Sequence, residues 1–422
     1  MGMILAPSQL RMMSPFIVQN SIVLTDDNIS SLSKVYTLTA PWTLSAWVRR
    51  SEIGAINNIL GTSGEVYFNA SNNVVAGALT STAAFASEAI HYHVHVSNNG
   101  LYVNNVYQGA VTTTNLTNAK LFDTFDGFVS DVHLKSGTQA PTDFGKYDAL
   151  GKWVPKAAAA GEHYLVFGNS AAWGENSGSG GAWTVNNILA TAFRYESPSD
   201  DPVNGIGQFP IWDTANSGPG TFTKGNSQLS YGTWTNRFNA TIKWPTTGKW
   251  YLEHKSIACS NTSGLHKIGG AAGGSLTFPI NGSAANEWII GADTSRLVAR
   301  QNASAYYNLA NVDTAWPLHN GTDIVGIYFD ADNNAVWCTH NGAVVEPGGG
   351  VTPDATMLAT VGTLDTTYAM IADPVIGQAN IWIQCCTSDS AVSATVETNF
   401  GAEGFVYTPK TGFQPLLAAL TP

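Results

Sequence analysis

The sequence is poor in charged residues, and it has no long apolar run. Asp, Glu, Lys and Arg make up 12% of its 422 residues, and 19 basic against 30 acidic residues give a formal net charge of -11. Such a balance repels a phosphate backbone or an anionic membrane surface. About 18 apolar residues never run together, and the first residues lack the pattern of a secretion signal. We therefore expect no nucleic acid ligand, no membrane insertion, and folding in a cytoplasm.

Cysteine is also scarce. The chain has four, all in its second half, and none shows the CxxC spacing of a zinc site: Cys259, Cys338, Cys385 and Cys386. Adjacent residues of a strand face opposite sides of a sheet, so Cys385 and Cys386 make a poor disulfide or metal pair. We expect reduced thiols that fill core space, which fits a cytoplasmic folding environment.

Long runs of helix-forming Glu, Lys and Leu are missing, whereas glycine numbers 42. This composition predicts an all-β protein. At 422 residues the chain exceeds the size at which one core stops growing, so two domains are expected. The sequence thus predicts two β-sandwich domains.

Alternating patterns mark the strands. In residues 42–50 the apolar positions Trp42, Leu44, Ala46 and Val48 share one face, which we expect to be the core face. Residues 90–96 and 126–134 alternate likewise. Residues 324–329 are apolar throughout, which predicts a strand buried on both faces. Asn341-Gly342 then predicts a type I′ hairpin turn.

The C-terminal pieces occur in a recognisable order. A buried strand over 322–330, a hairpin over 335–342, and the segments 396–401 and 405–409 together resemble the C-terminal half of SPRY domains. The resemblance implies a jelly-roll sandwich that binds partners through loops and is not an enzyme.

The N-terminal strands follow a second pattern. Residues 42–50, 102–105 and 125–134 resemble, in the same order, the laminin-G-like (concanavalin A-like) jelly-roll sandwich. Asn105 stands where that family usually has glycine, and asparagine also tolerates the left-handed backbone region.

Between the two patterns lies a Gly/Ser-rich stretch with tryptophans at 153, 173, 183 and 212. These rings predict a connector that packs on the domains. The linear order, with the stretches 151–156 and 176–187, resembles tail-associated structural proteins of bacteriophages from about residue 19 to 416. The expected organisation is an arm over 1–20, a LamG-like sandwich over 21–150, a connector over 151–235 and a SPRY-like sandwich over 236–422.

The resemblance implies a non-enzymatic virion protein located in the phage tail. It would be a tail fibre, spike or tail-tip component that binds a host-surface glycan or protein, or joins other tail proteins. It also implies a homo-oligomer, with a trimer favoured, and the apolar arm suits burial against a partner. A capsid decoration or head-fibre protein and a glycan depolymerase are the alternatives.

No catalytic motif supports the depolymerase alternative. The Glu-x-Asp-x-x-Glu pattern of jelly-roll glucanases is absent. Five glutamates that could be considered each stand alone in the sequence: Glu65, Glu162, Glu175, Glu253 and Glu397. There is no Gly-x-Ser-x-Gly elbow and no phosphate-binding Gly loop. We expect neither a catalytic residue nor a cofactor.

Two groups could in principle bind a metal. His91, His93 and His95 alternate along a strand and could ring an ion in a trimer, but an interior strand favours hydrogen-bonded packing histidines. Residues 330–334 show calcium-like oxygen spacing without the glycine and glutamate of an EF-hand, which favours a plain turn.

Tyr306, Tyr307 and Trp316 fall in a stretch that we expect to be an Asn/Thr-rich loop. Exposed aromatic rings on loops can stack on sugars or anchor a protein partner, and local packing is the alternative. These three are the candidate ligand-binding residues.

Overall fold

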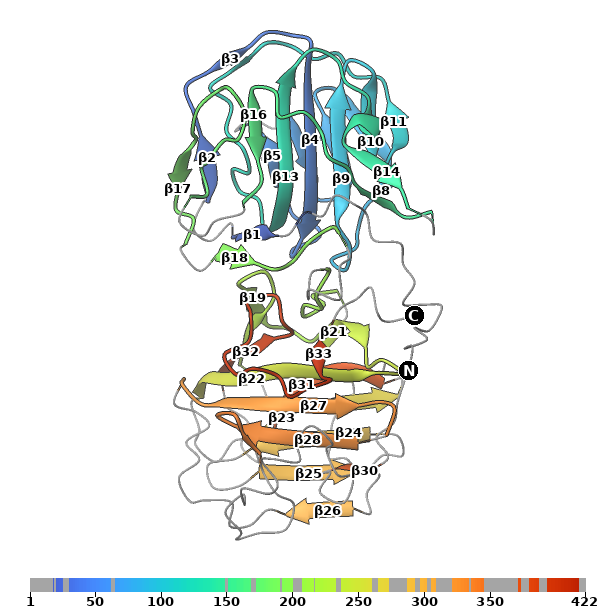
Figure 1. Cartoon of the computed structure of the whole chain (residues 1–422), viewed down its shortest axis with the longest axis vertical. Helices are drawn as coiled ribbons and strands as arrows, with labels where there is room; N and C mark the ends of the chain where they lie inside the picture. Colours follow the sequence, from blue (N-terminus) through green and yellow to red (C-terminus); the bar gives the residue numbers. More distant parts are fainter. Residues whose placement is uncertain are drawn as a thin grey trace. The chain divides into compact units, whose positions relative to one another are not determined.

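The computed structural model describes residues 18, 20–25, 30–61, 65–148, 151–167, 172–189, 192–199, 207–215, 217–232, 237–259, 265–272, 287–292, 297–301, 305–308, 321–333, 335–344, 371–372, 379–386 and 393–416. The chain divides into two compact units, Met1–Gln208 and Phe209–Pro422. Apart from short 3-10 turns, among them the helix η3 (Pro141–Asp143), the regular structure of the described residues is β-strand, which confirms the all-β prediction (Figure 1). No helix in that part of the chain is long and apolar enough to cross a membrane.

The main sheet of the first unit is antiparallel and follows the order β11-β10-β9-β4-β13-β1-β18, with β16 paired to β13 (Figure 1). Its strands are β1 (Ser21–Leu24), β4 (Trp42–Arg50), β9 (Tyr92–Ser97), β10 (Gly100–Val103), β11 (Val106–Gly109), β13 (Gly127–Ser136), β16 (His163–Leu165) and β18 (Phe193–Arg194).

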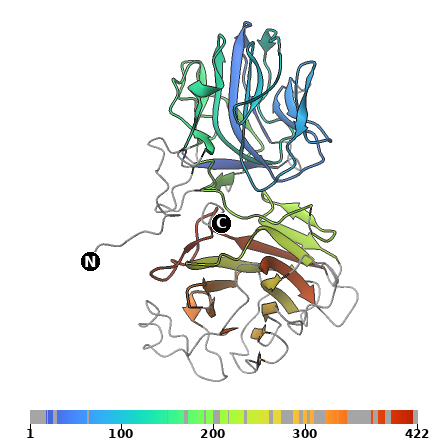
Figure 2. The ribbon, with the colours of Figure 1, turned by 90° about the vertical axis from the view of Figure 1, so that its right-hand side faces the viewer.

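A second sheet of the first unit follows the order β5-β6-β7-β8. Figure 2 shows the same ribbon turned by 90° about the vertical axis. Its strands are β5 (Asn57–Leu60), β6 (Val66–Phe68), β7 (Asn73–Ala76) and β8 (Leu79–Ala84). Three short ribbons complete the unit: β2 (Ser31–Ser33) with β17 (Thr184–Asn186), β3 (Thr37–Leu38) with β12 (Leu116–Thr117), and β14 (Gly145–Tyr147) with β15 (Trp153–Pro155).

Strand β4 differs from the prediction that one of its faces forms the core. All nine of its residues are buried. The polar face, which carries Ser45, Trp47 and Arg49, is covered by side chains from residues 141–199, among them Trp153 and Glu196. The predicted alternation of the strand is present, but residues 141–199 cover the face that alternation alone assigns to solvent.

The connector predicted over 151–235 is not a separate linker in the structure. Strands β15 to β18 pair with β14, β13, β2 and β1 of the first unit. The later strands β19 (Thr221–Thr223) and β20 (Gln228–Tyr231) pair with each other and, through β20, with β32 (Ala394–Asn399) of the second unit. The tryptophans at 153, 173, 183 and 212 are all buried, as expected of a connector that packs. The boundary between the units falls at Gln208 because the strands on either side belong to different sheets.

The second unit has two large sheets. The first follows the order β19-β20-β32-β22-β27-β28-β29, with β30 on β28 and β33 on β22. Its further strands are β22 (Lys249–Cys259), β27 (Ile324–Asp330), β28 (Ala335–His340), β29 (Ala343–Val344), β30 (Ile371–Ala372) and β33 (Gln414–Pro415). The other follows β21-β31-β23-β24-β25-β26, with β21 (Arg237–Lys243), β23 (Leu265–Ala272), β24 (Glu287–Ala292), β25 (Leu297–Gln301), β26 (Ala305–Asn308) and β31 (Ala379–Cys386).

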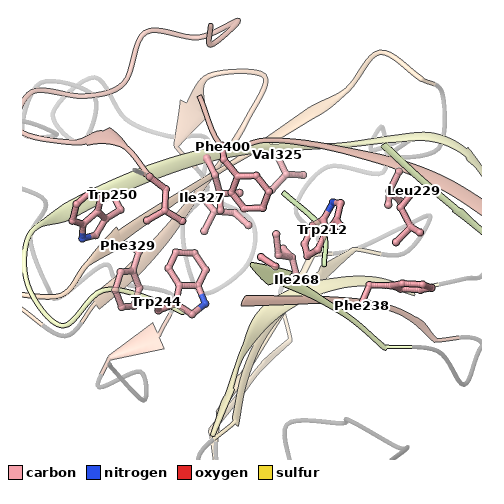
Figure 3. Close-up of a cluster of buried hydrophobic side chains, with 14 of the residues drawn as sticks. Trp212, Leu229, Phe238, Trp244, Trp250, Ile268, Val325, Ile327, Phe329 and Phe400 are labelled. Carbon is pink, nitrogen blue, oxygen red and sulfur yellow. The ribbon is translucent and has the colours of Figure 1, made fainter. Parts of the chain in front are cut away.

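The core of the second unit is aromatic. Figure 3 shows Trp212, Trp244, Phe329 and Phe400 among the buried side chains of one cluster. Strand β27 is buried along its whole length, as predicted from its continuous apolar pattern. Its other face contacts a second cluster with Tyr251, Tyr328, Trp337 and Phe413, so the C-terminal segment covers that side of the sheet. Asn341 and Gly342 both have positive φ, which confirms the predicted turn.

Candidate binding surface

The hairpin of β10 and β11 presents exposed aromatic rings on the first unit. Its turn residues Asn104 and Asn105 have φ of 50° and 66°. Asparagine is one of the few residues that adopts this region readily, as expected for Asn105 from the sequence. The Asn104 side chain accepts a hydrogen bond from the main-chain N of His93 at 2.8 Å, which fixes the turn to the neighbouring strand.

Three tyrosines surround this turn. Tyr102 and Tyr107 lie directly opposite each other on β10 and β11, with ring centroids 5.3 Å apart. Tyr147, at the end of β14, accepts a hydrogen bond at 3.5 Å from the Asn105 amide to its hydroxyl oxygen. Tyr107 is 55% exposed and Tyr147 54% exposed, and Tyr102 is half-buried. We call Tyr102, Tyr107 and Tyr147 the tyrosine platform.

A stack of buried rings supports the platform from below. Tyr147 meets Trp153 edge to face with centroids 5.0 Å apart, and Trp153 stacks on His93. His93 in turn stacks on Trp47 at 4.8 Å. Aromatic pairs of this kind contribute about 0.5–1.5 kcal/mol beyond the area they bury. Tyr147 is therefore an exposed ring on a rigid base.

Hydrogen bonds fix the middle of this stack. Trp153 Nε1 donates to His93 Nδ1 at 2.9 Å, and His93 Nε2 lies 2.8 Å from Ser45 Oγ. Because indole can only donate, His93 Nδ1 is the acceptor, and the ring proton resides on Nε2. The ring is held in one tautomer and one orientation.

The platform has little charge around it. Residues 96–119, which include β10, β11 and the strand β12, contain no Asp, Glu, Lys, Arg or His. Tyr147 is flanked by one residue of each sign, Lys146 and Asp148. An ionic ligand would therefore find no excess of opposite charge on the hairpin itself.

The three histidines proposed as a weak metal candidate lie in or beside β9 and are buried. His93 uses both ring nitrogens as described, and His95 Nε2 contacts the main-chain O of Gln139 at 3.2 Å. Burial lowers the pKa of His91 and His93 well below the usual range and that of His95 to about 4. Within the described residues, no group of three or more His, Cys, Asp or Glu is arranged to hold a metal ion. The geometry fits packing histidines.

Several carboxylates that stand alone in the sequence have structural partners. Glu253 is buried and accepts hydrogen bonds from Tyr251 OH at 3.1 Å and from the main-chain N of Val406 and Tyr407 at 3.0 and 2.8 Å. Burial raises its pKa, and these main-chain donors oppose the rise. Glu162 accepts from the main-chain N of Ser136 at 2.9 Å, and Glu397 pairs with Lys224 at 2.8 Å. These groups anchor loops and strands.

The turn after β27 is held by its own side chains. Asp330 accepts hydrogen bonds from the main-chain N and the side-chain amide of Asn333, and pairs with Lys249 at 3.0 Å. Asp332 accepts from the main-chain N of Gly248 at 2.8 Å. Both carboxylates thus take part in the plain turn that the sequence favours.

The predicted ligand-binding residues fall only partly within the described structure. Tyr306 and Tyr307 lie in strand β26, at the end of its sheet, and not in a loop as predicted. Aromatic residues favour strands, so the Ala305–Asn308 segment pairs with β25 in spite of its polar neighbours. Trp316 lies outside the described residues. Among the predicted thiols, Cys338 is free and buried, and burial raises its pKa.

The second unit has a shallow groove of about 670 Å³ over β19, β20 and β32. Small side chains line it, including Thr221, Ser230 and Thr395. The Ser230 and Thr395 hydroxyls lie 2.8 Å apart and form a hydrogen bond with each other.

No family model matches this chain, and no curated protein matches it either. Solved structures similar to it include the TRIM65 PSpry domain, at 12% identity and a TM-score of 0.29, over 44% of this chain and 92% of that one. The SPRY domain of human HERC1 is similar at 12% identity and a TM-score of 0.28, over 44% and 96% of the two chains. The Bacillus licheniformis beta-glucanase is similar at 12% identity and 0.27, over 44% and 82%. All three are 12% identical to this chain and have TM-scores below 0.5.

Proposed function

We propose that this chain is a non-enzymatic virion component of a bacteriophage, a tail fibre, spike or tail-tip protein that attaches to the host surface. The linear order of LamG-like, connector and SPRY-like motifs supports this class. The observation that carries attachment is the tyrosine platform: two rings more than half exposed on a base of stacked, hydrogen-bonded side chains.

The arrangement of carboxylates supports adhesion over cleavage. A retaining glycosidase needs two carboxyl groups about 5–5.5 Å apart in an open cleft. Glu253, Glu162 and Glu397 instead each hold main-chain or lysine partners. The depolymerase alternative would need catalytic groups other than these three.

Homo-oligomerisation, with a trimer favoured, belongs to the same proposal, as does contact with other tail proteins. A shallow platform gives a weak single contact, but a second contact on the same particle is intramolecular and has a high effective concentration. Several copies on one virion would therefore attach firmly through weak sites.

Adsorption competition tests attachment. Purified full-length chain should reduce adsorption of the phage that encodes it to its host cells, and the Tyr107→Ser/Tyr147→Ser variant should compete at least tenfold less well. Host polysaccharide incubated with the chain should keep its length. Equal competition by the variant would contradict the role of the platform, and shortened polysaccharide would show an enzyme.

A further inference from the structure

We infer that the tyrosine platform binds an uncharged glycan, a polymer of neutral sugars, and not an acidic glycan or a protein strand. This inference rests on the proposed attachment function and adds the class of ligand. Its starting point is the combination of exposed rings, hydroxyl groups and an amide on a hairpin without charge.

The rings share one face of the sheet. Directly opposed residues of antiparallel strands project to the same side, and His95, Tyr102 and Tyr107 are opposed in turn on β9, β10 and β11. Tyr147 reaches this side as well, because it packs on Trp153, which covers His93 on the same face of β9. The platform therefore offers neighbouring aromatic surfaces of the kind on which the apolar faces of sugar rings stack.

Polar groups stand between the rings. Asn105 gives one amide N–H to Tyr147 and, among the described residues, leaves its carboxamide oxygen unengaged. Tyr107 and Tyr147 each carry a hydroxyl group on an exposed ring. An aromatic base with a few hydroxyl and amide groups at its edge matches a ligand that combines apolar ring faces with many hydroxyl groups.

The charge pattern decides between neutral and acidic glycans. Recognition of a carboxylate usually employs an arginine or lysine. Residues 96–119 supply neither. Beside Tyr147, Lys146 and Lys152 stand with Asp148, whose carboxylate accepts a hydrogen bond from the main-chain N of Lys152 at 2.8 Å. A sugar with a carboxylate would lose water at this hairpin without gaining an ionic partner.

Two features oppose a protein strand as the ligand. The register of β10 with β11 shifts between Leu101 and Tyr102, so Gln108 forms a bulge, and bulges interrupt the pairing of an edge strand. The exposed large apolar residues of the hairpin and of β14 are, within the described structure, Val106, Tyr107 and Tyr147. The apolar surface of three side chains is small compared with the total of about 1,600 Å² that a stable protein interface buries.

The test is a glycan array with the full-length chain. It carries neutral polymers of glucose, mannose and galactose beside polymers with uronic or sialic acid. We expect binding to at least one neutral polymer, unchanged between about 0.05 and 0.5 M salt because no ion pair is involved. Tyr107→Ser/Tyr147→Ser should weaken it at least tenfold, and Tyr147→Phe should retain most of it.

Val106→Ser is the matched control, since Val106 is 58% exposed on the same strand but lies opposite the buried Val103, on the other face. It should bind as the parent does. Two results would contradict a neutral glycan as the ligand of the platform. One is salt-sensitive binding to acidic polymers, and the other is binding to neutral polymers that the Tyr107→Ser/Tyr147→Ser variant retains. A chain that blocks adsorption but binds no neutral polymer would refute this inference and leave attachment intact. If the chain binds a neutral polymer but is absent from virions, the proposed attachment function is refuted instead.

Discussion

At the scale of single residues, burial decides what a polar side chain does in this protein. The histidines of β9 and its flank alternate as a metal-binding strand would, yet each is enclosed by other parts of the first unit. Trp153 of β15 stacks on His93, Phe144 packs on His95, and His91 lies 3.5 Å from Glu196. His254 in β22 is equally enclosed and contacts Thr398 Oγ1 at 3.0 Å. These are neutral packing groups, and His93, His95 and His254 each form a hydrogen bond through at least one ring nitrogen.

This burial predicts acid sensitivity. Burial lowers the pKa of His95 and His254 to about 4, and it lowers the pKa of His91 and His93 well below the usual range. The unfolded chain binds these protons below about pH 6.5, whereas the folded chain does not. The free energy of unfolding should therefore be fully retained above pH 6.5 and fall toward pH 4, by about 1.4 kcal/mol per pH unit for each histidine.

Urea unfolding between pH 7.5 and 4.5 measures this dependence. His95→Gln, which keeps a donor for the main-chain O of Gln139, should reduce the slope. A midpoint that stays constant or rises on acidification would refute the assignment of neutral buried histidines.

A second residue prediction concerns the buried carboxylate of Glu253. Glu253→Gln places an amide NH₂ where a main-chain N–H of Val406 or Tyr407 needs an acceptor. The second unit should lose about 1–3 kcal/mol of unfolding free energy. Glu397→Gln, whose lysine partner is partly exposed, should cost less than about 1 kcal/mol. Equal losses in chemical denaturation would show that Glu253 is not a buried anchor.

At the scale of elements, the β10–β11 turn sets the position of the platform. Asn105 has a φ of 66°, a conformation that costs a β-branched residue about 1–2 kcal/mol. Asn105→Val should thus lower the thermal midpoint and weaken glycan binding, whereas Asn105→Gly should keep the midpoint. Calorimetry of the two variants checks this, and a stable Asn105→Val protein would contradict a turn with positive φ.

The periodicity of apolar side chains in the sequence predicted many strands, but few of the segments that pack against those strands. Alternation located β4, β9 and β13, and the continuous apolar run located β27, because side-chain period depends on neighbours in the sequence. The cover of β4 depends on contacts such as Trp153 with His93, 60 residues apart, which no local period encodes. The platform was missed for the same reason: Tyr102 and Tyr107 flank Asn104-Asn105 in the sequence, but Tyr147 joins them only through folding. The pair of tyrosines on either side of Asn104-Asn105 was the available signal in the sequence.

At the scale of the whole molecule, the boundary between the units has a direct consequence. A fragment ending at Gln208 retains β15 to β18, whereas one ending at residue 150 removes the cover of β9 and β4. We expect the first fragment to unfold cooperatively and the second to aggregate or melt well below it. Thermal unfolding followed by near-ultraviolet circular dichroism compares them. Equal midpoints would mean that residues 151–208 are a linker after all.

A cryo-electron microscopy map of the virion that carries this chain is the direct test of attachment by a tail protein. We expect two β-sandwich units per copy at the distal end of the tail, in several symmetry-related copies, with the β10–β11 hairpin on the outer surface. Density for the chain on the capsid, or a hairpin buried against another virion protein, would contradict it.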